Sequence, residues 1–163
     1  MTDEGAADAW VMSETELVAW GNSIGAEART PLVICLRGDL GSGKSTLARA
    51  IARGAGVHGP IPSPTFNLLY RYSTSRGVEI VHIDLYRLRS PEEVWALGWS
   101  ELAAGNELVM IEWPDRAESL LPPSRWEVAL SDVDDPELRA VLVTRSGAPG
   151  PLPFPGVRTV KEQ

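Results

Sequence analysis

The chain has 163 residues and a formal net charge of −7, with an ordinary globular composition apart from 13 prolines and 6 tryptophans. This length suits one domain, which buries about 70% of its unfolded surface around a single core. The acidic charge argues against nucleic-acid binding by this chain alone, because such binding depends mainly on Lys and Arg side chains at phosphates.

The first half of the chain predicts two helices and a strand. Residues 1–9 are small and acidic, and we expect them to be frayed. The capping box Ser13-Glu14-Thr15-Glu16 predicts a helix start. Four residues of that helix are expected to face inward: Leu17, Val18, Ile24 and Ala28. The apolar run 32–37 predicts a buried strand, and helical spacing of apolar residues predicts a helix over 44–54.

Between that strand and the second helix lies the phosphate-binding pattern G-x-x-x-x-G-K-[ST]. Its glycines let several backbone N–H groups surround a polyphosphate, and the helix dipole attracts the same anion. In this pattern Lys44 reaches the β- and γ-phosphates, and the Ser45 hydroxyl ligates Mg²⁺. A plain glycine-rich turn is the weaker alternative, because strand, spacing, Lys and Ser are all present. We expect a nucleoside triphosphate site at Gly38, Asp39, Leu40, Gly41, Ser42, Gly43, Lys44, Ser45 and Thr46.

The second half predicts two β-hairpins and a central strand. Strands 66–72 and 78–84 form the first hairpin, with a turn between them. Residues 108–111 are apolar on both faces, as a central parallel strand should be. Strands 125–131 and 137–145 form the second hairpin. Short helices are predicted from Ser90 and over 115–121.

These elements predict an α/β fold of the P-loop NTPase type. It has three layers, a central mostly parallel sheet and antiparallel hairpin additions. We expect a single domain over residues 1–146 and a disordered Pro- and Gly-rich tail over residues 147–163.

Two acids close apolar strands beside the predicted phosphate loop. Asp84 follows strand 78–83, and Glu112 follows strand 107–111. Ligands of α/β sheets gather at the carboxyl ends of parallel strands, and Mg²⁺ takes one or two carboxylates with phosphate oxygens and waters. One acid would hold the metal, and the other would orient or deprotonate the attacking water. Solvated acids at strand ends are the alternative, which is weaker for the pair than for either acid alone.

The sequence leaves the roles of Thr65 and Trp113 open. Thr65 lies on a stiff loop flanked by prolines, where its hydroxyl either contacts the γ-phosphate or Mg²⁺ or merely caps a turn. Trp113 either borders the nucleotide or packs at a strand end. His58 and His82 lack an expected nucleophile or base partner and are interpreted as structural.

Four motifs together resemble the TsaE (YjeE) family of bacterial ATPases, in the expected order between about residues 13 and 145. They are the phosphate loop, Ser63-Pro64-Thr65-Phe66, His82-Ile83-Asp84-Leu85-Tyr86-Arg87 and Ile111-Glu112-Trp113-Pro114. Members are needed for threonylcarbamoyl modification of the tRNA adenosine next to the anticodon. The resemblance implies ATP and Mg²⁺ as ligands, with Ser45 and Glu112 at the metal. It also implies a switch-like loop at Thr65, support of hydrolysis by Asp84, and Trp113 at the nucleotide.

The resemblance implies partners as well. Members work with TsaB and the transferase TsaD, so the protein would reach tRNA only through partner proteins. ATP hydrolysis would reset the complex between turnovers. Two departures stand out: Ser45 replaces the usual Thr but keeps the hydroxyl, and the tail after Gly147 matches no family motif.

Two other functions remain as alternatives. A P-loop small-molecule kinase would use the same phosphate site, with Arg87, Arg89 and Arg116 available for a lid. A GTPase switch is disfavoured because the Asn-Lys-x-Asp guanine signature is missing. We expect a cytoplasmic protein that binds neither membrane nor DNA. The chain has a single cysteine, Cys35, and shows no signal-peptide pattern. It also has no apolar run near the roughly 20 residues that a membrane span needs.

Overall fold

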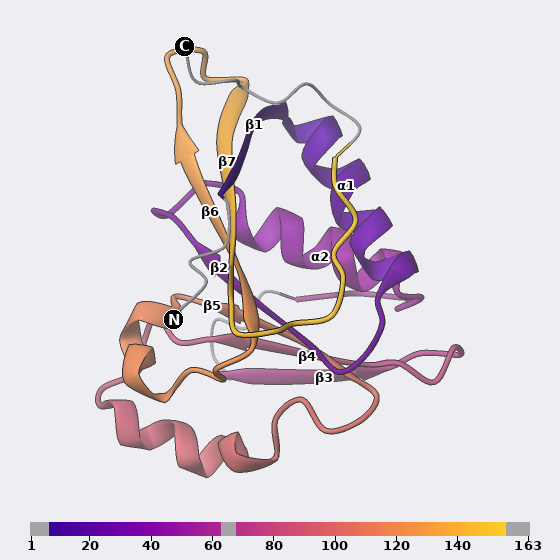
Figure 1. Cartoon of the computed structure of the whole chain (residues 1–163), viewed down its shortest axis with the longest axis vertical. Coiled ribbons are helices and arrows are strands. Elements are labelled where there is room, and N and C mark those ends of the chain that lie inside the picture. Colours follow the sequence, from indigo (N-terminus) through magenta and orange to yellow (C-terminus); the bar gives the residue numbers. More distant parts are fainter. Residues whose placement is uncertain (1–6, 63–67, 156–163) are drawn as a thin grey trace.

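The computed structural model describes residues 7–62 and 68–155 (Figure 1). A seven-stranded sheet has the order β1-β7-β6-β2-β5-β4-β3. The strands are β1 (Asp8–Ser13), β2 (Leu32–Arg37), β3 (Leu69–Ser73), β4 (Glu79–Asp84), β5 (Glu107–Glu112), β6 (Arg125–Asp132) and β7 (Leu138–Ser146). The helices are α1 (Glu14–Glu27) and α2 (Lys44–Gly54), with the 3-10 helices η1 (Pro91–Leu97), η2 (Trp99–Glu101) and η3 (Pro114–Leu120).

The centre of the sheet is parallel, and its two sides are antiparallel. Strand β2 pairs in parallel with β5 and β6, and β4 pairs in parallel with β5. The β3–β4 and β6–β7 hairpins are antiparallel, as is the pairing of β1 with β7. This confirms the predicted α/β fold with hairpin additions to a parallel centre.

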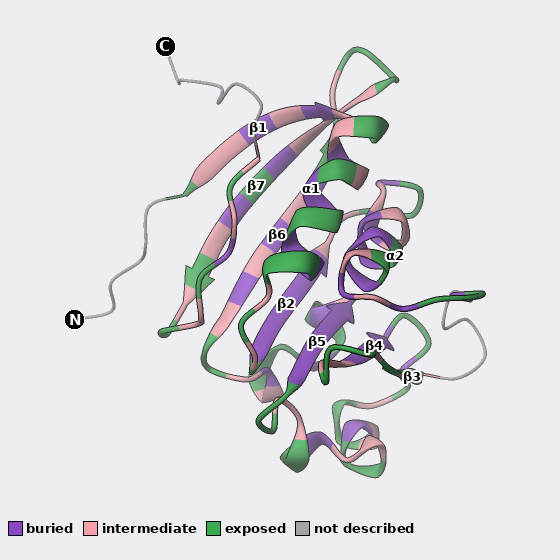
Figure 2. Cartoon of the chain, turned by 90° about the vertical axis from the view of Figure 1, so that its right-hand side faces the viewer, coloured by how far each residue is buried: buried purple, intermediate pink, exposed green. Residues whose placement is uncertain are grey.

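The sheet is the middle of three layers, with helices on both of its faces (Figure 2). One core lies between the sheet and helices α1 and α2, and it contains Ile34 of β2 and Leu47 of α2. The other core lies beneath η1, η2 and η3, and it contains Cys35 of β2 and Val94 of η1. Successive residues of β2 thus face opposite cores, which explains why this strand is apolar throughout.

Two predictions about the N-terminal region were wrong. Residues 8 and 9 are not frayed, because β1 is an edge strand whose Trp10 and Met12 face the core. In α1, Val18 is only half-buried, whereas Ala28, the C-cap residue, packs against the core as predicted. The buried positions are Leu17, Trp20, Gly21, Ile24 and Gly25. Glycine belongs on this face because α2 approaches so closely that a Cβ at position 25 would collide with its backbone.

The short helices predicted near Ser90 and over 115–121 are present as 3-10 helices η1 and η3. Among the residues that the structure describes, no helix combines the length and the apolar character needed to cross a membrane.

The C-terminal segment packs against the domain, in contrast to the expected disorder of residues 147–163. Residues 147–155 form no helix or strand, yet Leu152 is buried. The indole N–H of Trp126 donates to the Gly150 carbonyl at 2.7 Å, and that of Trp20 donates to the Pro153 carbonyl at 2.9 Å. Buried indole N–H groups need acceptors, and this segment supplies them. Residues 156–163 lie outside the described residues.

Replacing Leu152 with Ala is expected to lower the free energy of unfolding by about 2 kcal/mol, because it removes a buried side chain from the core. Phe154→Ala is the matched control, since Phe154 is 60% exposed and should cost less than half as much. Urea denaturation measures both. Equal and small losses would show that the segment does not pack as described.

Candidate phosphate and metal site

The loop between β2 and α2 has the backbone that its glycines permit. Gly38, Gly41 and Gly43 have φ values of 143°, 79° and 109°, in the region that favours glycine. A Cβ at Gly38 would lie 2.5 Å from the Leu130 carbonyl oxygen, so this position has no room for any residue other than glycine. No side chain of the described residues caps α2 at Gly43, so the first N–H groups of that helix are left for an anionic ligand.

Lys44 lies at the base of this loop and is 5% exposed. Its Nζ donates to the carbonyl oxygens of Gly38 at 2.5 Å and Asp39 at 2.8 Å. It also lies 4.3 Å from the centroid of the Trp113 ring, a cation–π distance. Burial lowers the pKa of Lys44, while the carboxylates of Glu112 and Asp84 oppose that shift. The lysine is therefore a partly desolvated cation held in place by backbone and indole.

Glu112 is the most constrained acid of the site, with an exposed fraction of 1%. Its Oε1 accepts a hydrogen bond from Ser45 Oγ at 3.0 Å, and its Oε2 lies 2.6 Å from His82 Nε2. A buried carboxylate needs such partners, because transfer of its charge from water is costly. The end of β5 is thereby joined to the start of α2 and to β4.

Asp84 is the direct register partner of Glu112 across the parallel β4–β5 pair. Its Oδ1 accepts a hydrogen bond from the Tyr86 backbone N–H at 2.9 Å, which fixes the orientation of the carboxylate. Burial raises the pKa of Asp84, and the neighbouring carboxylate of Glu112 adds to the rise. The two strand ends thus place one fully buried acid next to one half-buried acid of increased basicity.

Trp113 follows Glu112 with a backbone that is unusual for a bulky residue, at φ 55° and ψ 50°. This left-handed conformation is strained outside glycine, and such strain collects at functional sites. Its ring lies 4.9 Å from that of Tyr86, centroid to centroid. The turn therefore places the indole against both Tyr86 and the Lys44 cation.

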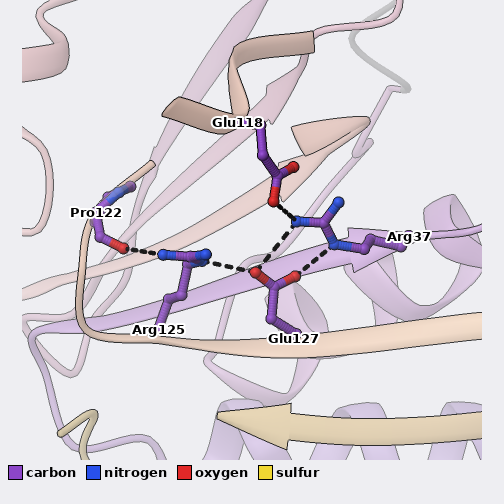
Figure 3. Close-up of polar contacts among 5 residues, drawn as sticks. All are labelled: Arg37, Glu118, Pro122, Arg125 and Glu127. Atoms are coloured by element: carbon purple, nitrogen blue, oxygen red, sulfur yellow. Dashed lines mark hydrogen bonds and ion pairs between the residues drawn. The ribbon is translucent and has the colours of Figure 1, made fainter. Parts of the chain in front are cut away.

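A network of ion pairs holds the base of the loop (Figure 3). Arg37, the last residue of β2, contacts Glu127 of β6 at 2.6 Å and Glu118 of η3 at 2.9 Å. Arg125 contacts the same Glu127 at 2.6 Å. The network ties the strand that enters the loop to the helix that follows Trp113.

A cavity of about 400 Å³ opens between the loop and the two acidic strand ends. Most predicted site residues line it: Leu40, Gly41, Gly43, Lys44, Ser45, Thr46, Asp84, Glu112 and Trp113. Three further residues line this cavity. Leu68 and Tyr86 are not among the predicted site residues, and Arg87 is predicted there only for the kinase alternative.

Of the remaining predicted site residues, those that the structure describes do not line this cavity. Gly38 and Asp39 contact Lys44 through their carbonyls, and Ser42 lines a second cavity on the far side of the loop. Thr65 lies outside the described residues.

His82 is interpreted from the sequence as structural, and its contact with Glu112 is not predicted there. The structure places its imidazole against Glu112. The pattern that could have revealed it is the two-residue spacing between His82 and Asp84, which puts both side chains on one face of the strand.

The site suits Mg²⁺ bound together with phosphates better than a metal bound by protein alone. Within residues 7–62 and 68–155, no group of three or more His, Cys, Asp or Glu side chains could hold a metal. The hydroxyl of Ser45 and the carboxylate of Glu112 instead offer two adjacent oxygen ligands. Mg²⁺ commonly binds with so few protein ligands, since phosphate oxygens and waters complete its shell.

A phosphate loop between a central parallel strand and a helix, with two acids at neighbouring strand ends, defines a P-loop protein of the α/β class. Residues 11–140 match the sequence profile of the family described as "Threonylcarbamoyl adenosine biosynthesis protein TsaE". The chain belongs to this family.

Individual relatives agree with this assignment. The tRNA threonylcarbamoyladenosine biosynthesis protein TsaE of Rickettsia felis is 42% identical over 123 residues, which cover 75% of this chain and 71% of the relative. The protein of the same name from Haemophilus influenzae is 36% identical over 104 residues, with 64% and 65% covered. The crystal structure of Bacillus subtilis YdiB superposes with a TM-score of 0.72 at 26% identity, covering 90% of this chain and 88% of that one.

Asp84→Asn is expected to raise the free energy of unfolding at neutral pH. Burial holds the folded-state pKa of Asp84 above its unfolded value, so the ionised carboxylate destabilises the fold at any pH above the folded pKa. Asn keeps the acceptor for Tyr86 N–H. The gain should shrink as pH falls through the folded pKa towards the ordinary value of about 4. Urea denaturation across that range checks this, and a loss of stability at neutral pH would contradict it.

Proposed function

We propose that this protein is the Mg²⁺-dependent, ATP-binding and ATP-hydrolysing subunit for threonylcarbamoyl modification of the tRNA adenosine next to the anticodon. It would act with TsaB- and TsaD-type proteins. The observation that carries the proposal is that Lys44, Ser45, Asp84 and Glu112 line one cavity beside the phosphate loop. Family membership and the names of the relatives support the tRNA pathway.

In this proposal the loop binds the phosphates, and the two acids act on the metal and on the attacking water. The loop N–H groups and Lys44 bind the phosphates, and Ser45 and Glu112 hold Mg²⁺. The metal supplies charge neutralisation and orientation at the terminal phosphates. Asp84 orients the attacking water and accepts its proton, for which its raised pKa suits it better than an ordinary carboxylate. The water oxygen bonds to the γ-phosphorus, and the bond from phosphorus to the ADP oxygen breaks.

The nucleoside would occupy the second cavity, of about 470 Å³, on the other side of the loop. The two cavities share Gly41, Gly43 and Thr46. The start of α1 at Glu14 and the β6–β7 turn at Glu137 border this second cavity. A nucleotide lying across the loop would therefore have its phosphates on one side and its base on the other.

Charge and surface chemistry support a role in an assembly. The net charge of −7 suits a subunit that leaves tRNA binding to its partners, and we propose that it works with them in the cytoplasm. At the mouth of the first cavity, Leu40 is 70% exposed and Tyr86 is 40% exposed. Such apolar side chains beside a catalytic cavity offer a contact surface for a partner.

A small-molecule kinase is the second candidate, and Arg87 at the cavity is the observation that favours it. A screen for stoichiometric phosphoryl transfer to nucleosides and metabolites would separate the two functions. Transfer to an acceptor other than water would support the kinase.

The isolated protein should hydrolyse ATP slowly, and a TsaB–TsaD complex should accelerate hydrolysis by at least about tenfold, because a partner can complete an open site. Steady-state phosphate release with and without the complex measures this. Equal turnover in both conditions would contradict the proposed role.

Lys44→Ala should weaken ATP binding by about 10- to 100-fold, since it removes a charge-assisted contact with phosphate. Arg49→Ala is the matched control, because it removes the same charge from an exposed position of the same helix. Calorimetric titration with ATP and Mg²⁺ gives both affinities. Equal losses in the two variants would assign the effect to net charge instead.

A further inference from the structure

We propose that His82 is a positioning residue, whose imidazole Nε2 holds the Glu112 carboxylate in the orientation in which Glu112 and Ser45 receive Mg²⁺. This inference rests on the proposed function and deepens it, since it assigns a role to a side chain that binds neither nucleotide nor metal itself.

The sheet register places the imidazole beside this acid. His82 and Asp84 share a face of β4, and across the parallel pair they are matched with Met110 and Glu112 of β5. The imidazole therefore reaches Glu112 along the diagonal. The distance from Nε2 to Oε2 is 2.6 Å, and the two side chains are 1% and 2% exposed.

Each carboxylate oxygen of Glu112 has a separate partner. Oε1 accepts from the Ser45 hydroxyl, so this oxygen faces the residue that the phosphate-loop pattern assigns to Mg²⁺. Oε2 is the other carboxylate oxygen, and it contacts His82 instead. Without the imidazole, Oε2 would be a buried acceptor that has lost its hydrogen bond, and the carboxylate would be free to turn.

The other ring nitrogen indicates which tautomer is present. His82 Nδ1 is buried and has no hydrogen-bond partner among the described residues. A proton on Nδ1 would be a buried, unpaired donor, so we assign the ring proton to Nε2. Nε2–H then donates to the carboxylate, which is the role that an outer-shell histidine plays towards a ligating acid.

Metal affinity distinguishes a positioning role of His82 from a role in packing alone. An apolar side chain of similar size would fill the space of the imidazole but could not hold Oε2. Loss of an outer-shell hydrogen bond typically costs about 10- to 100-fold in metal affinity or activity. A histidine that only packs would leave the Mg²⁺ requirement unchanged when replaced by Leu.

Three variants test this: His82→Leu removes the donor, His82→Gln returns an amide N–H at the reach of Nε2, and His82→Asn carries one that is too short. The readout is Mg²⁺ titration of a fluorescent methylanthraniloyl ATP analogue bound to the full-length protein, which requires no turnover. We expect metal-free binding within about twofold of wild type in all three. The Mg²⁺ concentration at half-saturation should rise about tenfold or more in Leu and Asn and stay within about threefold of wild type in Gln.

The outcomes are separable. If His82→Leu does not fold in a thermal melt, the Gln and Asn pair still decides the question. A wild-type Mg²⁺ requirement in Leu or Asn, or a defect in Gln as large as in Asn, would overturn the positioning role alone. A wild-type protein whose binding of the analogue ignores Mg²⁺ would overturn the proposed function, and this inference with it.

Discussion

The buried carboxylate of Glu112 is the constraint on which the whole site depends. It ends a strand that is buried along its entire length, where an ionised group is costly unless it is hydrogen-bonded. Its two partners come from different elements, Ser45 at the start of α2 and His82 in β4. One side chain thus fixes the first turn of the helix that follows the phosphate loop relative to two central strands. The geometry of the proposed metal and triphosphate site is in this way part of the packing of the core.

The same region also carries several energetically unfavourable features. Asp84 is a desolvated acid, Lys44 is a buried cation, and Trp113 has a left-handed backbone. Such features persist where function requires them and the surrounding structure compensates. Here the compensation comes from apolar cores on both faces of the sheet and from the ion pairs of Arg37 behind the loop.

Much of this arrangement could be predicted from sequence because it follows from local rules. The glycine pattern predicts the loop, and apolar strands that end in Asp84 and Glu112 predict two acids at one edge of a parallel sheet. What local rules could not predict depends on distant contacts. Strand β1 forms because β7 offers an edge, and the segment 147–155 is ordered because Trp20 and Trp126 need acceptors. The contact between His82 and Glu112 could not be predicted because the two residues lie 30 positions apart in the chain.

The most direct test is a crystal structure of the protein with Mg²⁺ and a non-hydrolysable ATP analogue. We expect the triphosphate beneath the Gly38–Ser45 loop and the metal next to Ser45 Oγ and Glu112, with His82 still in contact with Glu112. A nucleotide bound away from this loop would contradict the central claim, as would a metal held by other side chains with neither Ser45 nor Glu112 in contact with it.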